Sequence, residues 1–150
     1  MEPIVDLQIL NRDSHSDSEL KEFFALKNIA VVGMSRYSEK AAHFVPKYLI
    51  KHGYNVIPVN PSVTEILGRK SFPVVSSVPS DIDVVDIFRP SDDVLPVVVD
   101  SIKKRGIKLI WMQEGIYSEQ AEKVAREKGI KVVYNRCMMA EHMRLFSDAD

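Results

Sequence analysis

The sequence predicts an α/β protein built on a doubly wound, five-stranded parallel sheet with helices on both faces. Five short apolar segments follow one another along the chain, at residues 28–33, 54–59, 83–88, 107–111 and 130–134. Segments of helical length separate most of them, at about residues 43–52, 92–105 and 118–129. Strands joined by helices of this length need crossover connections, which make neighbouring strands parallel. Continuous apolar runs are typical of strands that are buried on both faces.

The chain is expected to begin with a loosely structured segment, residues 1–17, followed by a single domain over residues 18–150. Ser16 and Glu19 have the spacing of a capping box, in which each side chain accepts a hydrogen bond from the other residue's backbone N–H. A helix is therefore predicted to begin here. The apolar face of this helix consists of Leu20, Phe23, Phe24 and Leu26.

The connection after the first predicted strand is long for this type of fold. Gly33 closes the strand, and Pro46, which has no backbone N–H, fits best in the first turn of the next helix. That helix is predicted to begin near residue 43, after a loop of about nine residues. Loops longer than usual in α/β units often carry function.

Glycine and proline positions indicate the remaining elements. Residues 61–82 interrupt the alternation of strands and helices, so a long connection with one short helical turn is expected there. Gly106 and Gly129 are predicted to end the two helices before them in the left-handed conformation. A last helix is predicted over residues 138–146.

Composition and charge exclude several classes of function. Lys and Arg number 20 against 21 Asp and Glu, a net charge of −1, so nothing indicates a nucleic-acid or anionic-membrane partner. No apolar run reaches the roughly 18 residues of a membrane span, and the acidic start is unlike a signal peptide, so a cytoplasmic protein is expected. The single cysteine, Cys137, excludes an internal disulfide, and the four histidines lack metal-ligand spacing. We therefore expect no metal site.

Polar and turn-forming residues follow each predicted strand. Ligands of open parallel sheets bind at the carboxyl ends of the strands, where the strand order reverses. A binding site is therefore expected at residues 33–36, 59–61, 88–90, 113–115 and 135–137.

The first strand end lacks the fingerprint of a dinucleotide site. That fingerprint needs G-x-G-x-x-G and an acidic residue after the second strand, whereas here only Gly33 is present and Asn60 follows the second strand. The Walker lysine motif is also absent. Two hydroxyl groups and two cations follow Gly33 instead, from Ser35, Arg36, Ser38 and Lys40. Together with Arg89 after the third strand, they predict a pocket for an anion with several phosphates.

Five short motifs occur at the predicted strand ends. They are V-G-M-S at 32–35, P-V-N-P at 58–61, D-I-F-R at 86–89, W-M-Q-E-G at 111–115 and N-R-C at 135–137. In this order and spacing they resemble the small CoA-binding domain proteins, which are similar to the N-terminal domain of the succinyl-CoA synthetase alpha subunit. The resemblance covers about residues 20–146 and implies a Rossmann-like fold that binds coenzyme A (CoA). The ligase chemistry of that subunit needs a second domain and is not implied.

The resemblance also implies which residues contact the cofactor. The pyrophosphate and pantetheine region would meet the loop of Met34, Ser35, Arg36, Tyr37 and Ser38. The adenosine part would lie beside Val59, Asn60, Pro61, Phe88 and Arg89. The pantetheine arm would lie along Gln113, Glu114 and Gly115. CoA carries a 3′-phosphate on its ribose, so a cation suits it where NAD requires a carboxylate.

The sequence thus predicts a protein that binds CoA or an acyl-CoA without evident catalytic machinery. One alternative is a small acyl-CoA-dependent enzyme or subunit that uses a partner's residue or Cys137, whose thiolate the neighbouring Arg136 would favour. The other alternative is an NAD(P)-binding, redox-sensing module. A protein partner or a homo-oligomer is compatible with the sequence. Asp86, within an apolar strand, is expected to have a hydrogen-bond partner.

Overall fold

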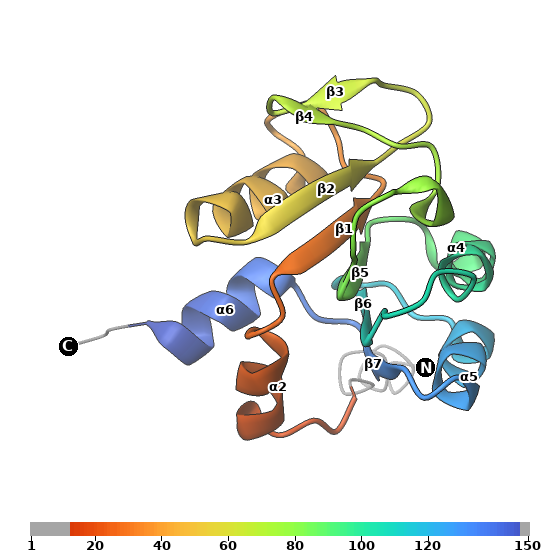
Figure 1. Ribbon diagram of the computed structural model, residues 1–150. Coiled ribbons are helices and arrows are strands. Elements are labelled where there is room, and N and C mark those ends of the chain that lie inside the picture. The colour runs from red at the N-terminus through yellow and green to blue at the C-terminus, as the bar shows by residue number, and fades with distance from the viewer. Residues whose placement is uncertain (1–12, 148–150) are drawn as a thin grey trace, which may run out of the picture.

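The computed structural model describes residues 13–147 and places a parallel sheet between two layers of helices (Figure 1). The strand order is β2-β1-β5-β6-β7, and each neighbouring pair is parallel. The strands are β1 (Asn28–Val32), β2 (Asn55–Val59), β5 (Val84–Ile87), β6 (Leu109–Met112) and β7 (Lys131–Val133). The predicted fold class is confirmed, because five parallel strands form in the expected places with helices on both sides.

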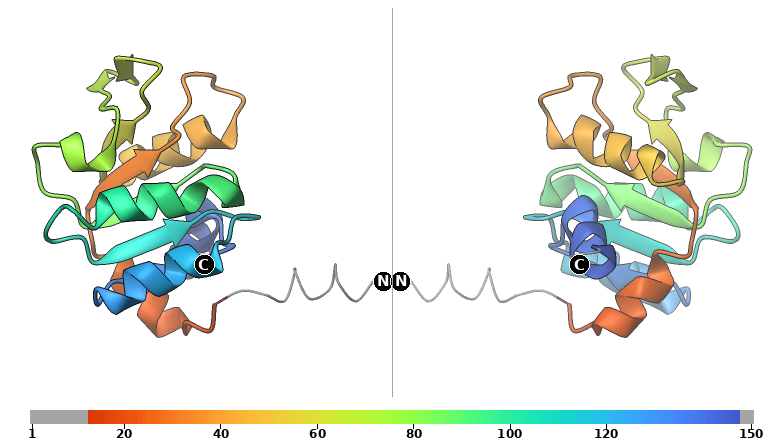
Figure 2. Two further views of the ribbon diagram at one scale, coloured as in Figure 1. Left: turned by 90° about the vertical axis from the view of Figure 1, so that its right-hand side faces the viewer. Right: turned by 90° about the vertical axis from the view of Figure 1, so that its left-hand side faces the viewer.

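Each face of the sheet has its own helices and its own core (Figures 1 and 2). One face carries α2 (Asp17–Phe23), α3 (Ala41–Lys51) and α6 (Met138–Phe146), and the other carries α4 (Val94–Ser101) and α5 (Glu119–Glu127). Successive side chains of a strand point to opposite faces, so β6 supplies both cores. Trp111 packs on the α3 side, and Ile110 and Met112 pack on the α4 side.

The strand order reverses around β1. β1 lies between β2 and β5, so the chain leaves β1 through α3 to one side and later returns to the other side. The carboxyl ends of these three strands therefore surround the place where open parallel sheets bind ligands.

α3 begins at Ala41, two residues before the predicted start near residue 43, so the placement of Pro46 in its first turn is wrong. Pro46 is the sixth residue of this helix and lies beyond its first turn. A proline there leaves the carbonyl oxygen of Ala42 without its helical donor, which would be the N–H of residue 46. The N–H of Ser35, in the preceding loop, donates to this oxygen instead at 3.0 Å. Because Pro46 has no N–H, the carbonyl oxygen of Ala42 is free to accept the hydrogen bond from Ser35, and this bond holds the loop in place.

The connection over residues 61–82 contains more structure than predicted. The expected helical turn is present as η1 (Val75–Ser77), but β3 (Glu65–Ile66) and β4 (Arg69–Lys70) also form a small antiparallel hairpin. Leu67 and Gly68 turn this hairpin with φ angles of 52° and 74°. Turns with two positive φ angles usually contain Asn-Gly or Asp-Gly, so Leu-Gly gave no sequence signal.

The predicted helix over residues 92–105 is shorter and has two parts. A 3-10 turn, η2 (Ser91–Asp93), leads into α4, which ends at Ser101. Gly106 has a positive φ of 93° but lies beyond this end, so it does not terminate α4 as predicted. Gly129, with φ 78°, does follow the end of α5 as predicted.

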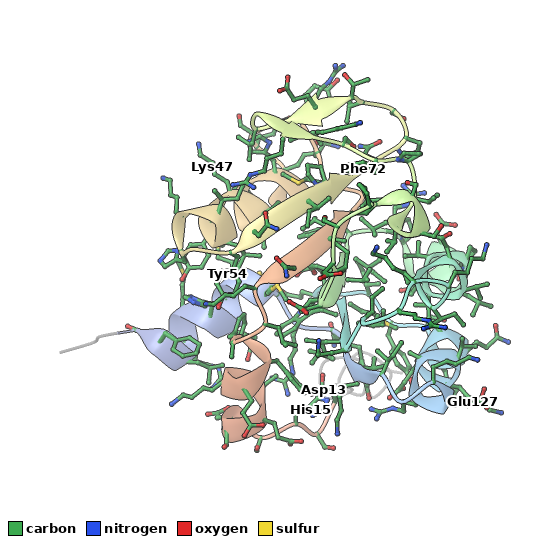
Figure 3. All side chains as sticks on the ribbon, viewed as in Figure 1. Asp13, His15, Lys47, Tyr54, Phe72 and Glu127 are labelled. Carbon is green, nitrogen blue, oxygen red and sulfur yellow. The ribbon has the colours of Figure 1, made fainter. Side chains whose placement is uncertain are left out.

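The first described residues contact the outer edge of β7 (Figure 3). The Asp13 carboxylate accepts a hydrogen bond from the N–H of Tyr134 at 2.9 Å, and His15 Nε2 donates to the carbonyl oxygen of Val132 at 2.8 Å. The capping box of Ser16 and Glu19 is confirmed at the start of α2. The segment predicted to be loosely structured otherwise lies outside the described residues. No helix in residues 13–147 is both long and apolar enough to cross a membrane.

Candidate functional site

Two adjoining cavities lie at the carboxyl ends of β1 and β2. The larger, of about 530 Å³, is lined by Val32, Gly33, Val59, Asn60, Pro61, Ser62, Pro73, Val74, Val75, Arg89, Pro96, Val97 and Asp100. The smaller, of about 410 Å³, is lined by Gly33, Met34, Ser35, Arg36, Tyr37, Lys40, Ala42, Asn60, Ser62, Val63 and Phe88. Because the two cavities share Gly33, Asn60 and Ser62, they can hold two parts of one extended ligand.

Gly33 lines both cavities and has no room for a side chain. Its φ of 83° is in the left-handed region, which favours glycine. A Cβ atom at this position would lie 2.6 Å from the carbonyl oxygen of Phe88. The absence of a side chain therefore allows the end of β1 to approach the end of β5 closely.

Three hydrogen bonds hold Ser35 in the loop before α3. Its N–H donates to Ala42, its carbonyl oxygen accepts from His43 Nδ1 at 2.7 Å, and its Oγ accepts from the N–H of Tyr37 at 3.0 Å. The hydroxyl proton of Ser35 has no acceptor within the described chain. It is therefore available to donate to a ligand in the smaller cavity.

Asn60 fixes the wall that both cavities share. Its Nδ2 donates to the carbonyl oxygen of Met34 at 2.8 Å, and its Oδ1 accepts from the N–H of Ser62 at 2.8 Å. The Met34 side chain is fully buried in the core on the α3 side. Asn60 thus orients the backbone at Met34 and at the beginning of the 61–82 connection.

Cations lie around both cavities. Arg36 and Lys40 are exposed and line the smaller cavity, where the Arg36 guanidinium lies over the Tyr37 ring at 5.1 Å from its centroid. Arg89 lines the larger cavity and forms an ion pair of 3.0 Å with Asp93, with both side chains half-exposed. Exposed pairs of this kind contribute little to stability, so Arg89 can exchange its partner.

Four of the residues predicted to bind cofactor lie outside both cavities: Ser38, Gln113, Glu114 and Gly115. Gln113 is buried, and its Oε1 accepts from the N–H of Met138 at 3.2 Å, at the start of α6. The N–H of Gly115 donates to Asn135 Oδ1 at 2.7 Å. Residues 113–115 therefore support the loop after β7, and their contact with a ligand stays a prediction.

Several lining residues had no sequence signal. They come from the 61–82 connection and from α4: Ser62, Val63, Pro73, Val74, Val75, Pro96, Val97 and Asp100. The connection returns along the outer edge of β2, where the N–H of Phe72 donates to Pro58 at 3.1 Å. That return brings the residues after Phe72 to the larger cavity. None of them follows a predicted strand, so the rule for strand ends did not find them.

Asp86 does not have the hydrogen-bond partner that the sequence analysis expected. It lies on β5 between Val31 and Trp111 of the neighbouring strands, is fully buried, and faces the core on the α3 side. Neither carboxyl oxygen has a hydrogen-bond partner in the described part of the chain. Burial raises the pKa of Asp86 well above its ordinary value. This carboxyl group therefore keeps its proton to a higher pH than an exposed aspartic acid does.

Cys137 lies away from the cavities, and the arginine beside it is already paired. Arg136 is buried, and its guanidinium is paired with Asp13 at 3.1 Å and with Glu141 at 3.3 Å. Cys137 is half-buried at the start of α6 and lines neither cavity. The charge of Arg136 is thus already balanced by two carboxylates, and its predicted effect on the thiol stays a prediction. Residues 13–147 also contain no group of three or more side chains that could hold a metal ion.

A comparison with protein families connects this geometry to a known group. A family model described as "CoA binding domain" matches residues 27–143, which include both cavities. This chain belongs to the CoA-binding domain family. The family resemblance stated from the five sequence motifs is confirmed.

Members and relatives of the CoA-binding domain family differ in size. The uncharacterized protein YneT of Bacillus subtilis is 35% identical over 85% of this chain and 94% of its own. The ADP-forming acetate–CoA ligase II of Archaeoglobus fulgidus is 27% identical over 81% of this chain, but this match spans only 20% of the ligase.

The solved structures also include both small proteins that match over most of their length and larger enzymes that match over one part. A hypothetical protein from Pyrococcus horikoshii is 43% identical, with a TM-score of 0.86 over 89% of this chain and 94% of that chain. The dinucleotide-forming acetyl-coenzyme A synthetase 1 of Ca. Korarchaeum cryptofilum is 33% identical, with a TM-score of 0.64 over 73% of this chain. This match spans 26% of the synthetase, so the chain is similar to one part of that enzyme.

Proposed function

We propose that this protein binds coenzyme A, free or acylated, in the two adjoining cavities at the strand ends. The start of α3 carries this proposal. It lines the smaller cavity and has neither a side-chain cap nor an acidic residue in its first turn. By contrast, Ser16 and Ser118 cap α2 and α5, and both of those helices have acidic first turns. The start of α4 also lacks these groups, but Asp92 and Asp93 of η2 directly precede it. A helix start without these groups attracts an anion, because its N–H groups and dipole are uncompensated.

The groups around the smaller cavity suit a pyrophosphate. Arg36 and Lys40 supply positive charge, and Ser35 supplies a hydroxyl proton from a fixed position. Hydrogen bonds between such donors and a charged oxygen are stronger than neutral ones. We therefore assign the pyrophosphate of CoA to the smaller cavity.

The larger cavity suits the adenosine part. Valines and prolines form most of its wall, and Arg89 and Asp100 are the charged residues of its lining. An aliphatic slot is suitable for a flat purine ring. Arg89, released from its exposed pair with Asp93, would then bind the 3′-phosphate of the ribose.

The names of the larger relatives agree with this ligand. Acetate–CoA ligases and acetyl-coenzyme A synthetase act on CoA or form its thioester, and this chain is similar to one part of them. The ligand is carried over to this chain, but the reaction of those enzymes is not. We propose a CoA-binding protein without its own catalytic centre.

The enzyme alternative gains no support from the site. One form of it requires Cys137 as a nucleophile near the thioester, but Cys137 lines neither cavity, and Arg136 beside it is paired with two carboxylates. The form that uses a partner's residue stays a prediction. The missing glycines and Asn60 at the end of β2 argue against the NAD(P) alternative, which the melting experiment below tests directly.

Thermal unfolding with a series of nucleotides tests the proposed ligand. The purified protein, freed of copurified ligand, is melted with CoA, acetyl-CoA, dephospho-CoA, NAD and NADP. CoA should raise the melting temperature increasingly with its concentration, and dephospho-CoA should raise it less. Equal shifts for CoA and dephospho-CoA would remove the role of Arg89, and no shift with CoA would refute the proposed function.

Two charge-removing variants locate the pyrophosphate. Arg36→Ala and Lys40→Ala should each weaken CoA binding about tenfold, the effect of losing roughly 1.4 kcal/mol of charge-assisted hydrogen bonding. Lys128→Ala, which removes an exposed lysine at the end of α5, is the matched control and should leave the affinity unchanged. Isothermal titration calorimetry measures all three.

A further inference from the structure

The helix α4 is apolar on its outer face as well as on its inner face. Val94 and Val98 are fully buried against the sheet. On the outer side Val99 is 43% exposed and Pro96 is exposed, and Leu95 and Ile102 flank them, half-buried and packed in part against the core beneath α4. A helix that packs on one side and faces water on the other normally has polar residues outside. The outer face of α4 therefore has the composition of a contact surface.

The neighbouring helix shows the contrast. α5 covers the same face of the sheet, and its exposed residues are polar or charged: Glu119, Gln120, Lys123, Arg126 and Glu127. Both helices thus have a buried apolar side, but of the two only α4 also has apolar residues on its exposed side.

One more exposed apolar side chain extends this surface. Val74 is 44% exposed and precedes η1, which packs beside α4 through a hydrogen bond of 3.0 Å from the N–H of Ser76 to Asp100. Figure 2, left, looks onto this face, where α4 lies in front of the sheet between η1 and α5. We call the surface of Val74, Leu95, Pro96, Val99 and Ile102 the α4 patch.

Opposite charges stand at the two ends of the α4 patch. Asp92 lies in η2 directly before α4, and Lys103 follows Ile102, the residue that caps the end of α4. Arg105 adds a second cation at the same end as Lys103. All three side chains are exposed, and none forms an ion pair with any residue in the described part of the chain.

We propose that the α4 patch is a two-fold interface between two copies of this chain, with the two α4 helices antiparallel. A two-fold axis near Val99 places the acidic end of each helix opposite the basic end of the other. An interface of this symmetry must be complementary to itself, and a stripe that runs from acidic through apolar to basic meets that condition. The antiparallel arrangement also sets the two helix dipoles in opposite directions.

The interface would cover part of the rim of the larger cavity. Val74 and Pro96 belong to the α4 patch and also line that cavity. Self-association therefore narrows the opening beside α4, and a ligand in the cavity would influence the association constant. The interface goes beyond the proposed function, because it does not depend on which ligand the cavity holds.

Sedimentation velocity over a wide range of protein concentrations tests the proposal. The wild-type chain should form dimers as its concentration rises. Val99→Asp places two like charges near the two-fold axis and should weaken dimerisation at least tenfold, as expected at the centre of an interface. Met143→Asp is the matched control, because Met143 is 49% exposed on α6, on the other face of the sheet. Circular dichroism checks that each variant is folded.

Charge reversal tests the antiparallel arrangement. Asp92→Lys and Lys103→Asp should each weaken the dimer, and the double variant should restore it, because opposite charges face each other again. A wild-type chain that stays monomeric at every concentration overturns the proposal. So does a dimer that Met143→Asp and Val99→Asp weaken equally, or one that the double variant fails to restore.

Discussion

At residue scale, Gly33 in the candidate site and Asp86 in the core are under the clearest physical constraints. Gly33 combines a positive φ with a distance of 2.6 Å between a notional Cβ and the Phe88 carbonyl oxygen. Asp86 is a fully buried carboxyl group without a hydrogen-bond partner in residues 13–147. The backbone at the cavity therefore requires glycine at position 33. Burial of the Asp86 carboxyl group without a partner costs free energy in the core on the α3 side.

Gly33→Ala should destabilise the protein by about 2–4 kcal/mol, the sum of a left-handed alanine and a steric clash with backbone. Gly106→Ala is the control, because Gly106 has a similar φ of 93° but no atom within 4 Å of the added Cβ. That control should lose only about 1–2 kcal/mol. Urea unfolding gives both values, and equal losses would show that the approach to Phe88 has no energetic effect.

Asp86→Asn should remove a pH dependence of stability. The folded state keeps the Asp86 proton because burial raises the pKa, whereas the unfolded state releases it above about pH 4. The unfolded state then binds fewer protons, so the free energy of unfolding falls as pH rises from about 4 to the folded-state pKa, by at most about 1.4 kcal/mol per pH unit.

Urea unfolding from pH 4.5 to 8 measures this difference. Asp86→Asn should have a flatter profile than the wild type, whereas Asp81→Asn, at an exposed position, should retain the wild-type profile. A constant difference between Asp86→Asn and wild type at every pH would show that Asp86 does not titrate differently in the folded and unfolded states.

At the scale of elements, α6 is attached to the rest of the molecule through an aromatic cluster around His142. His142 Nδ1 forms a hydrogen bond of 2.8 Å with the Tyr48 hydroxyl of α3, and its ring packs edge-on against Phe24 and Tyr54. Burial lowers the pKa of His142, and the nearby His52 and Lys27 lower it further. The packing of α6 therefore favours the neutral form of the His142 imidazole.

Acidification should loosen this attachment. The folded pKa of His142 is lower than the unfolded value of about 6.5, so its contribution to stability is complete above that pH and is lost as pH falls toward the folded pKa. His142→Gln can still accept a hydrogen bond but cannot gain a proton. Its melting temperature should fall less between pH 7.5 and 5.5 than that of the wild type, and an equal fall in both would contradict this role.

At the scale of the whole molecule, a buried ionic network connects the start of the described chain to the loop after β7. The Asp13 carboxylate pairs with Arg136 and accepts a hydrogen bond from the N–H of Tyr134, and Glu141 of α6 pairs with the same arginine. The carbonyl oxygen of Arg136 also accepts from Trp111 Nε1 at 2.8 Å. Segments more than 120 residues apart along the chain are thus held in one cluster.

Asp13→Ala should cost about 3–5 kcal/mol, because it leaves Arg136 buried with one of its two carboxylate partners and removes the acceptor for Tyr134. Arg126→Met is the control, since its ion pair with Glu122 is exposed on α5 and should contribute less than about 1 kcal/mol. Chemical unfolding compares the two variants. Similar small losses would show that the network does not hold the N-terminal segment.

Much of the fold was predictable because it depends on local patterns. The five apolar runs became β1, β2, β5, β6 and β7, and the last helix formed over residues 138–146 as predicted. The predicted boundaries of α3 and α4 were less accurate. Pro46 lies inside α3 because the N–H of Ser35 replaces the hydrogen bond that proline cannot make, and a turn separates Gly106 from the end of α4. The β3–β4 hairpin was missed because Leu67 has a positive φ that its residue type does not indicate.

The sequence by itself determined the five parallel strands and the crossover connections, because periodicity and chain order can be read directly along the chain. It also predicted a site at the strand ends, where the two cavities lie. Ten of the fourteen predicted cofactor residues line the two cavities, since strand ends meet at one edge. Only the tertiary structure determined three features. They are the cavity wall formed by residues 73–75 and α4, the hydrogen bonds that fix Ser35, and the lack of a hydrogen-bond partner for Asp86 among residues 13–147. Each of these depends on segments that are distant in sequence and meet only when the sheet and its helices have packed.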